Sequence, residues 1–281
     1  MFYIEKNDKP NWLERKLNLI KVQENTIILP INENSKEKQI EKIATKTNKK
    51  VRKYSTSKKV VLSKNMYKEQ KYINYLNTYG LEIQDGKRLF EILLPDITEY
   101  IINKKQFERN KCVISMMIND LTDIEFENIK TLARKYKTIN IVTNHIEKFK
   151  NLEKQLQENE GIIITITNNK KKSLMKSQII LNIDFPKELI NKYNIQDEAI
   201  IVNVRGNIKI NKKRFNGLNI NDYEIDFRDD KKDNKALSNK FYLKDLYESD
   251  LYKKQNISET RNKIKIDKVI IKKLILNNGE L

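Results

Sequence analysis

Residues 113–142 read VISMMINDLTDIEFENIKTLARKYKTINIV, and this stretch decides the fold. The almost wholly apolar run Val113–Ile118 is typical of a strand that is covered on both faces in a parallel sheet. The segment Thr122–Glu125 fits a helix capping box, and apolar residues at helical spacing follow it. A second strand is predicted at Ile139–Val142. A strand, a helix and a strand in this order predict a right-handed parallel crossover.

The same alternation continues to Arg205. Further strands are predicted at Ile162–Ile166, Ile179–Ile183 and Ala199–Val204. Together the five strands predict an α/β fold with a Rossmann-like parallel five-stranded sheet over about residues 112–205. The domain organisation expected from the whole chain is a small α/β domain over 1–86, a connecting helix over 87–110, the Rossmann-like domain over 111–206 and an irregular, mixed C-terminal segment over 207–281.

The chain carries a formal charge of +18, which raises the class of nucleic-acid-binding proteins. Only nine of its 56 basic residues are Arg, the residue that bidentate recognition of phosphate favours. Lys, Asn and Ile are abundant together, as expected of a protein from an A/T-rich genome. Nucleic acid therefore stays one candidate partner, and the basic runs that would meet it are Lys46–Lys59, Lys170–Lys176 and Lys209–Arg214.

The single cysteine, Cys112, excludes an intramolecular disulfide and a Cys-rich metal site. It opens an apolar strand, so a buried and inert thiol is expected. No run approaches the roughly 18 apolar residues of a membrane span, and the N-terminus lacks the plan of a signal peptide. The sequence therefore predicts a cytoplasmic protein without a membrane partner or a metal.

An open parallel sheet binds its ligand beyond the carboxyl ends of its strands, where the strand order reverses. With the usual order this point lies between the first and the fourth predicted strand. The polar residues that follow the first four strands are the candidate ligand-binding residues Asn119, Asp120, Thr143, Asn144, Asn168 and Asp184. The basic residues Lys170, Lys171 and Lys172 lie beside them and are the candidate anion-binding residues.

The segment Ile141–Lys148 resembles the second strand of the NAD(P)-binding domain in shikimate dehydrogenases and glutamyl-tRNA reductases. The resemblance implies a nicotinamide cofactor whose adenosine ribose meets the polar stretch Thr143-Asn144. Those families carry a glycine-rich turn after the first strand, but here residues 119–123 read NDLTD without a glycine. Because the carboxylates near this turn would repel a pyrophosphate, the turn argues against standard NAD(P) binding.

The sequence thus favours a cytoplasmic Rossmann-like protein that is either non-catalytic or a divergent ligand-binding protein, with a small anion as its ligand. Two alternatives stay open. One is an NAD(P)-dependent oxidoreductase with an atypical nucleotide site built from Asn119, Thr143, Asn144 and Lys170–Lys172. The other is a basic nucleic-acid-binding protein. Whether the chain is an enzyme is undecided at this point.

Overall fold

The computed structural model describes residues 1–281 except 33, 212, 229–234, 252–255 and 278. The chain is a mixed α/β protein with two sheets in which parallel pairs predominate, which confirms the predicted fold class. It divides into two compact units. Unit 1 comprises Met1–Gly86 and Asp230–Lys253, and unit 2 comprises Lys87–Asp229 and Lys254–Leu281. Each unit has its own sheet and is described by itself.

Unit 1 is built on a five-stranded sheet with the order β2-β3-β1-β4-β5. The strands are β1 (Phe2–Lys6), β2 (Lys21–Gln23), β3 (Thr26–Leu29), β4 (Lys59–Leu62) and β5 (Glu82–Gln84), with β2 antiparallel to β3 and the other pairs parallel. The helices are α1 (Trp12–Leu17), α2 (Glu37–Tyr54), η1 (Lys64–Lys68), α3 (Gln70–Thr78), α10 (Lys235–Ser238) and α11 (Leu243–Leu251). In the core, the buried Tyr72 hydroxyl donates a hydrogen bond to Thr47 Oγ1 at 2.9 Å.

Unit 2 is built on an eight-stranded sheet with the order β13-β12-β11-β10-β9-β6-β7-β8. Its strands are β6 (Val113–Met117), β7 (Thr138–Val142), β8 (Thr165–Thr167), β9 (Ile179–Asn182), β10 (Ile200–Asn203), β11 (Leu218–Phe227), β12 (Val269–Leu276) and β13 (Gly279–Glu280). Strands β6 to β11 are parallel and have the doubly wound order 3-2-1-4-5-6. All five predicted strands are therefore present, and residues beyond Gly206 add one parallel and two antiparallel strands.

The third predicted strand starts later than expected. Gly161 ends the preceding helix in a left-handed conformation with φ of 64°, and regular pairing begins only at Thr165. Ile163 is 76% exposed. The apolar run Ile162–Ile166 therefore overstated the length of this strand, because β8 is the edge of the sheet and contacts a neighbouring strand on one side only.

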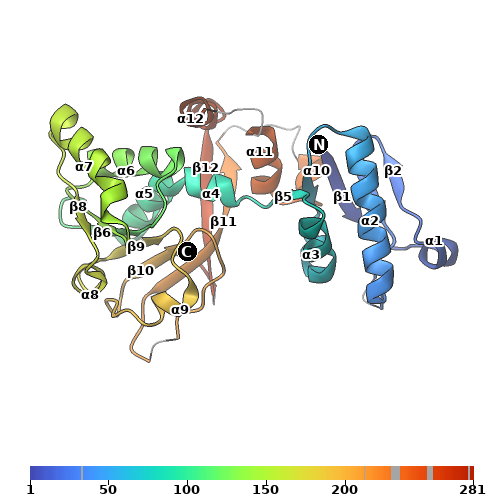
Figure 1. Ribbon diagram of the computed structural model, residues 1–281, viewed down its shortest axis with the longest axis horizontal. Helices are drawn as coiled ribbons and strands as arrows, with labels where there is room; N and C mark the ends of the chain where they lie inside the picture. Colours follow the sequence, from blue (N-terminus) through green and yellow to red (C-terminus); the bar gives the residue numbers. More distant parts are fainter. Residues whose placement is uncertain (33, 212, 229–234, 252–255, 278) are drawn as a thin grey trace. The chain divides into compact units, whose positions relative to one another are not determined.

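Helices cover both faces of the sheet of unit 2. Helices α5 (Leu94–Lys105), α6 (Asp123–Lys135) and α7 (Ile146–Glu160) lie on one side, and α8 (Lys170–Leu174) and α9 (Lys187–Ile190) on the other (Figure 1). Helices α4 (Lys87–Ile92) and α12 (Ile257–Ile266) complete the unit. The Thr122–Glu125 capping box is present. In the part of the chain that the structure describes, no helix is both long and apolar enough to cross a bilayer.

A row of asparagines joins the central strands of unit 2, from the carboxyl ends of β9 and β10 to the start of β11. Asn182 Nδ2 of β9 donates to Asn203 Oδ1 of β10 at 3.0 Å. Asn203 Nδ2 in turn donates to Asn219 Oδ1 of β11 at 2.8 Å and to Asn221 Oδ1 at 2.9 Å. Because each buried amide has partners, the row stabilises one register of β9, β10 and β11 and fixes the edge that carries the candidate site.

Candidate functional site

The strand order reverses between β6 and β9, as predicted, because β9 pairs in parallel with β6 rather than with β8. This arrangement brings Asn119, which follows β6, against Asp184, which follows β9. The Asn119 backbone N–H donates to Asp184 Oδ1 at 3.0 Å and to Oδ2 at 2.8 Å. The Asp120 backbone N–H donates to Asp184 Oδ2 at 3.0 Å. The protein's own carboxylate thus occupies the place where these N–H groups would meet an external anion.

Three more of the predicted residues join this pair. Asn119 Oδ1 accepts a hydrogen bond from the Asn144 backbone N–H at 3.0 Å. Lys170 Nζ donates to Asn144 Oδ1 at 2.6 Å, and Lys148 Nζ donates to Asp120 Oδ1 at 2.7 Å. The Lys148 ammonium lowers the pKa of Asp120 below its ordinary value. We call the connected residues the edge network: Asn119, Asp120, Asn144, Lys148, Lys170 and Asp184.

The remaining predicted residues lie nearby but have local roles. Thr143 is buried, and its Oγ1 accepts the His145 backbone N–H at 3.0 Å. The Asn168 carbonyl accepts the Lys170 backbone N–H at 3.0 Å at the start of α8. Lys171 and Lys172 are exposed on α8. Of the predicted anion-binding lysines, the structure therefore brings only Lys170 into the edge network.

A second cluster at the same edge was missed by the sequence analysis. Arg205 follows β10, and its Nη2 donates to Glu91 Oε1 at 2.9 Å and to Glu125 Oε1 at 3.1 Å. Glu125 is completely buried, and its other oxygen accepts hydrogen bonds from the Thr122 backbone N–H at 3.1 Å and from the Thr122 hydroxyl. We call these three charged residues the edge cluster, namely Glu91, Glu125 and Arg205.

Burial dominates the electrostatics of the edge cluster. Desolvation, followed by the adjacent Glu91 carboxylate, raises the pKa of Glu125 to about 8 despite the opposing charge of Arg205. A pKa of about 8 favours the protonated form of Glu125 at neutral pH. The sequence analysis assigned Glu125 to helix capping alone. Its contact with Arg205 could have been found only by noting that Arg205 follows the fifth predicted strand and therefore also lies at the carboxyl edge of the sheet.

An open cavity of about 900 Å³ lies beside the edge cluster, and we call it the edge pocket. Glu91 and Arg205 line it together with Arg88 of α4, Asp123 of α6 and Asn256 at the start of α12. The Asn256 side chain accepts the Ser258 backbone N–H at 2.8 Å and so caps α12. The exposed Arg88 side chain makes no hydrogen bond or ion pair with a residue that the structure describes.

The structure gives no sign of a reactive thiol at Cys112 or of a metal centre among the described residues. Cys112 is 3% exposed, and desolvation raises the pKa of its thiol to about 11. Its thiol is therefore protonated and unreactive at neutral pH. Within the described ranges, no three His, Cys, Asp or Glu side chains are placed to hold a metal ion.

No protein-family model matches the chain, and no curated protein matches it in sequence. The solved structures similar to it include aspartate transcarbamoylase from Trypanosoma cruzi with carbamoyl aspartate and phosphate, at 10% identity and a TM-score of 0.32, covering 73% of this chain and 72% of that one. Ornithine carbamoyltransferase from Pyrococcus furiosus matches at 10% identity and a TM-score of 0.30, with coverages of 73% and 72%. TM-scores this low do not support assigning the activity of one chain to another.

The resemblance to the nicotinamide-binding domains of shikimate dehydrogenases and glutamyl-tRNA reductases is wrong, since the solved structures found are carbamoyltransferases. The geometry gives a physical reason for the error. The N–H groups of Asn119 and Asp120, which a glycine-rich turn would offer to a pyrophosphate, bind the Asp184 carboxylate instead. The segment Ile141–Lys148 matched only the general pattern of a buried strand that leads into a helix.

Proposed function

We propose that the protein binds a small monoanionic molecule in the edge pocket. The observation that carries this proposal is the pair of arginines, Arg88 and Arg205, at an open cavity beside a buried, protonated carboxyl group. A volume of about 900 Å³ lies in the range of small-molecule sites. A buried titratable group with a strongly shifted pKa beside a cleft is itself a common mark of a functional site.

The two arginines have different roles in this proposal. Arg205 is held by Glu91 and Glu125, so its orientation is set before a ligand arrives. Arg88 has no carboxylate partner among the described residues and is available to pair with the anionic group of the ligand. A planar carboxylate suits this arrangement because a guanidinium binds it through two parallel hydrogen bonds.

The carboxylates around the edge pocket limit the charge of the ligand. Glu91, Asp123 and Glu127 also line the cavity, so a ligand with several negative charges would be repelled. The same carboxylates accept hydrogen bonds from a hydroxyl or an amino group. A small carboxylic acid with a neighbouring hydroxyl or amino group would pair with the arginines through its carboxylate and with the lining carboxylates through its hydroxyl or amino group. The hydrogen bonds of the edge network hold the turn between β6 and α6, which leads into the pocket-lining residues Thr122 and Asp123.

The test is a ligand screen with a matched arginine control. We expect the unfolding midpoint of unit 2 to rise with at least one small hydroxy acid or amino acid at millimolar concentration, since a ligand at 100 times its Kd adds about 2.7 kcal/mol. Arg88→Gln should lower the affinity for that ligand at least tenfold. Arg109→Gln, a surface change at an arginine paired with Glu99, should leave the affinity unchanged. The proposal fails if no acid in the panel shifts the midpoint or if Arg88→Gln binds as the unchanged protein does.

A further inference from the structure

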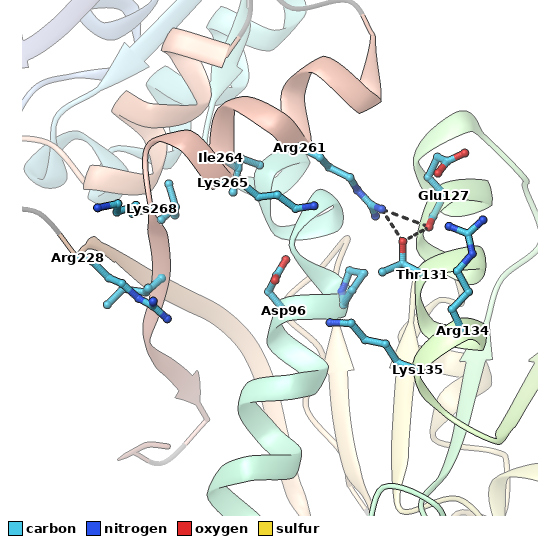
Figure 2. A pocket seen from close by; sticks show the side chains of 13 residues that line it. Asp96, Glu127, Thr131, Arg134, Lys135, Arg228, Arg261, Ile264, Lys265 and Lys268 are labelled. Carbon is cyan, nitrogen blue, oxygen red and sulfur yellow. Dashed lines mark hydrogen bonds between the residues drawn. The ribbon is translucent and has the colours of Figure 1, made fainter.

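Unit 2 has a second cavity, of about 560 Å³, and six of its 13 lining residues are cationic (Figure 2). It lies among α5, α6, α12 and the start of β12, and we call it the cationic pocket. The cationic residues that line it are Arg134, Lys135, Arg228, Arg261, Lys265 and Lys268. Asp96 and Glu127 are the carboxylates among its lining residues. Figure 2 shows Arg261 and Lys265 of α12 facing the α6 residues across the cavity.

Among the described residues, the hydrogen bonds of Arg261 all go to neutral oxygens, and the carboxylates of Glu127 and Asp96 act on it only through their charge. Its Nη1 donates to Thr131 Oγ1 at 2.6 Å and to the Glu127 carbonyl at 3.4 Å, and its Nη2 donates to Asn128 Oδ1 at 2.5 Å. Burial lowers the pKa of Arg261, but a guanidinium stays charged in a protein. This half-buried cation thus loses hydration without a carboxylate hydrogen-bonded to it among the described residues, and an anion in the cavity would compensate that cost.

Four of the other five cations of the pocket fall into two groups. Arg134 binds Glu160 through two hydrogen bonds of 2.6 and 2.7 Å, and Lys135 lies 3.6 Å from Glu99. The exposed side chains of Arg228 and Lys265 make no ion pair or hydrogen bond with a described residue.

The carboxylates do not cancel the charge of the cationic pocket. Glu127 lies 3.7 Å from Lys130, so its charge is matched from outside the cavity. The lining itself carries six cations and two carboxylates, and Arg134, Lys135 and Glu127 each have an ion-pair partner outside it. The excess resides mainly on Arg228, which follows β11, and on Arg261 and Lys265 of α12.

We propose that the cationic pocket binds a compact polyphosphate group, either of a nucleotide or of a free polyphosphate. Several cations from separate elements converge on one concave site, and guanidinium groups match phosphate oxygens through paired hydrogen bonds. A single carboxylate would leave most of this charge unmatched. The enclosed volume of about 560 Å³ favours a compact ligand over the extended backbone of a nucleic acid. The two pockets share Glu127 in their linings, but the arginines that line them are different residues, and this proposal does not depend on the ligand of the edge pocket.

The test uses inorganic tripolyphosphate and ATP as probes, measured by calorimetry at two salt concentrations. The unchanged protein should bind tripolyphosphate, with an affinity that falls as salt rises. The double variant Arg228→Gln/Lys265→Gln changes exposed side chains, so it should fold normally and lose at least tenfold in affinity. The control Lys104→Gln removes an exposed α5 lysine outside the lining and should bind normally. Arg88→Gln should also bind normally, which separates this site from the edge pocket.

The outcomes have distinct meanings. Equal affinity for the two probes assigns the binding to the phosphates, and tighter binding of ATP assigns the site to nucleotides. Either result supports the proposal. Absence of tripolyphosphate binding, or normal binding by the double variant, overturns it. Binding of a ten-residue oligothymidylate without binding of tripolyphosphate also overturns it, because the surface would then recognise an extended backbone.

Discussion

Substitution of Glu125 by Gln should make unit 2 more stable at alkaline pH, although it removes a completely buried charged residue. Glutamine keeps the shape of the protonated acid and can still accept from Thr122 or Arg205. Its amide can also donate toward Glu91, the neighbouring carboxylate that raises the pKa of Glu125. The variant therefore mimics the protonated state of the edge cluster at every pH.

The sign and size follow from the pKa of Glu125. Its value rises from 4.5 to about 8 on folding, so the folded state binds more protons than the unfolded state between these values. The free energy of unfolding then falls as pH rises through this window and levels off above it. At about 1.4 kcal/mol for each pH unit, the loss reaches about 4–5 kcal/mol as an upper bound. The opposing charge of Arg205 is already contained in the pKa of about 8, and access of water to the cluster reduces the expected loss to about 2–4 kcal/mol.

The assay compares urea unfolding of the two proteins at pH 5.5 and pH 9 by circular dichroism. The single tryptophan, Trp12, lies in unit 1, so its fluorescence does not follow the relevant unit. Amide hydrogen exchange of β6 and β9 gives a second measure for unit 2. The variant should match the unchanged protein at pH 5.5 and exceed it at pH 9. As a control, Glu147→Gln on the exposed start of α7 should show no such difference. A stability difference between Glu125→Gln and the unchanged protein that is independent of pH would show that the pKa of Glu125 is not raised on folding.

Three other outcomes are expected. Asn203→Leu leaves buried amides of the asparagine row unpaired, so unfolding should require about 2–3 kcal/mol less; full stability in urea titration would show that the row is not needed. Asp184→Ala frees two backbone N–H groups and should lose about 1–3 kcal/mol, part of which added sulfate restores; a loss that sulfate leaves unchanged would contradict the assignment of this carboxylate as an internal anion. Tyr72→Phe removes a buried hydrogen bond and should lower the stability of unit 1 by about 0.5–1.5 kcal/mol by tryptophan fluorescence, against no change for the exposed Tyr54→Phe.

The parallel sheet of unit 2 could be predicted because its evidence is local. Runs such as Val113–Ile118 and Ile179–Ile183 are apolar throughout, and only a strand covered on both faces needs that pattern. The doubly wound order then follows from general rules for parallel crossovers. Strands β11 and β12 lie in the segment over 207–281 that was expected to be irregular and mixed, because their pairing joins residues far apart in the chain, such as Phe227 with Val269 and Ile220 with Leu276.

The candidate site could be predicted only in part, because some of its contacts follow from the strand topology and others depend on tertiary packing. Asn119 and Asp184 meet because parallel strands end at one edge, so their proximity follows from topology alone. The contact of Arg205 with Glu91 joins residues 114 positions apart and depends on how α4 packs against α6. The approach of Arg261 to α6 likewise depends on tertiary packing. A formal charge of +18 could not show which of the basic residues gather around one cavity.

The central claim is that the edge pocket holds a small monoanionic acid, and a crystal structure of the complex tests it most directly. The crystals would be grown with the acid that raises the unfolding midpoint most in the screen. We expect electron density for its carboxylate between Arg88 and Arg205, with a hydroxyl or amino group directed at Glu91. Density for the ligand at any other place on the protein, with an empty edge pocket, would contradict binding at this site.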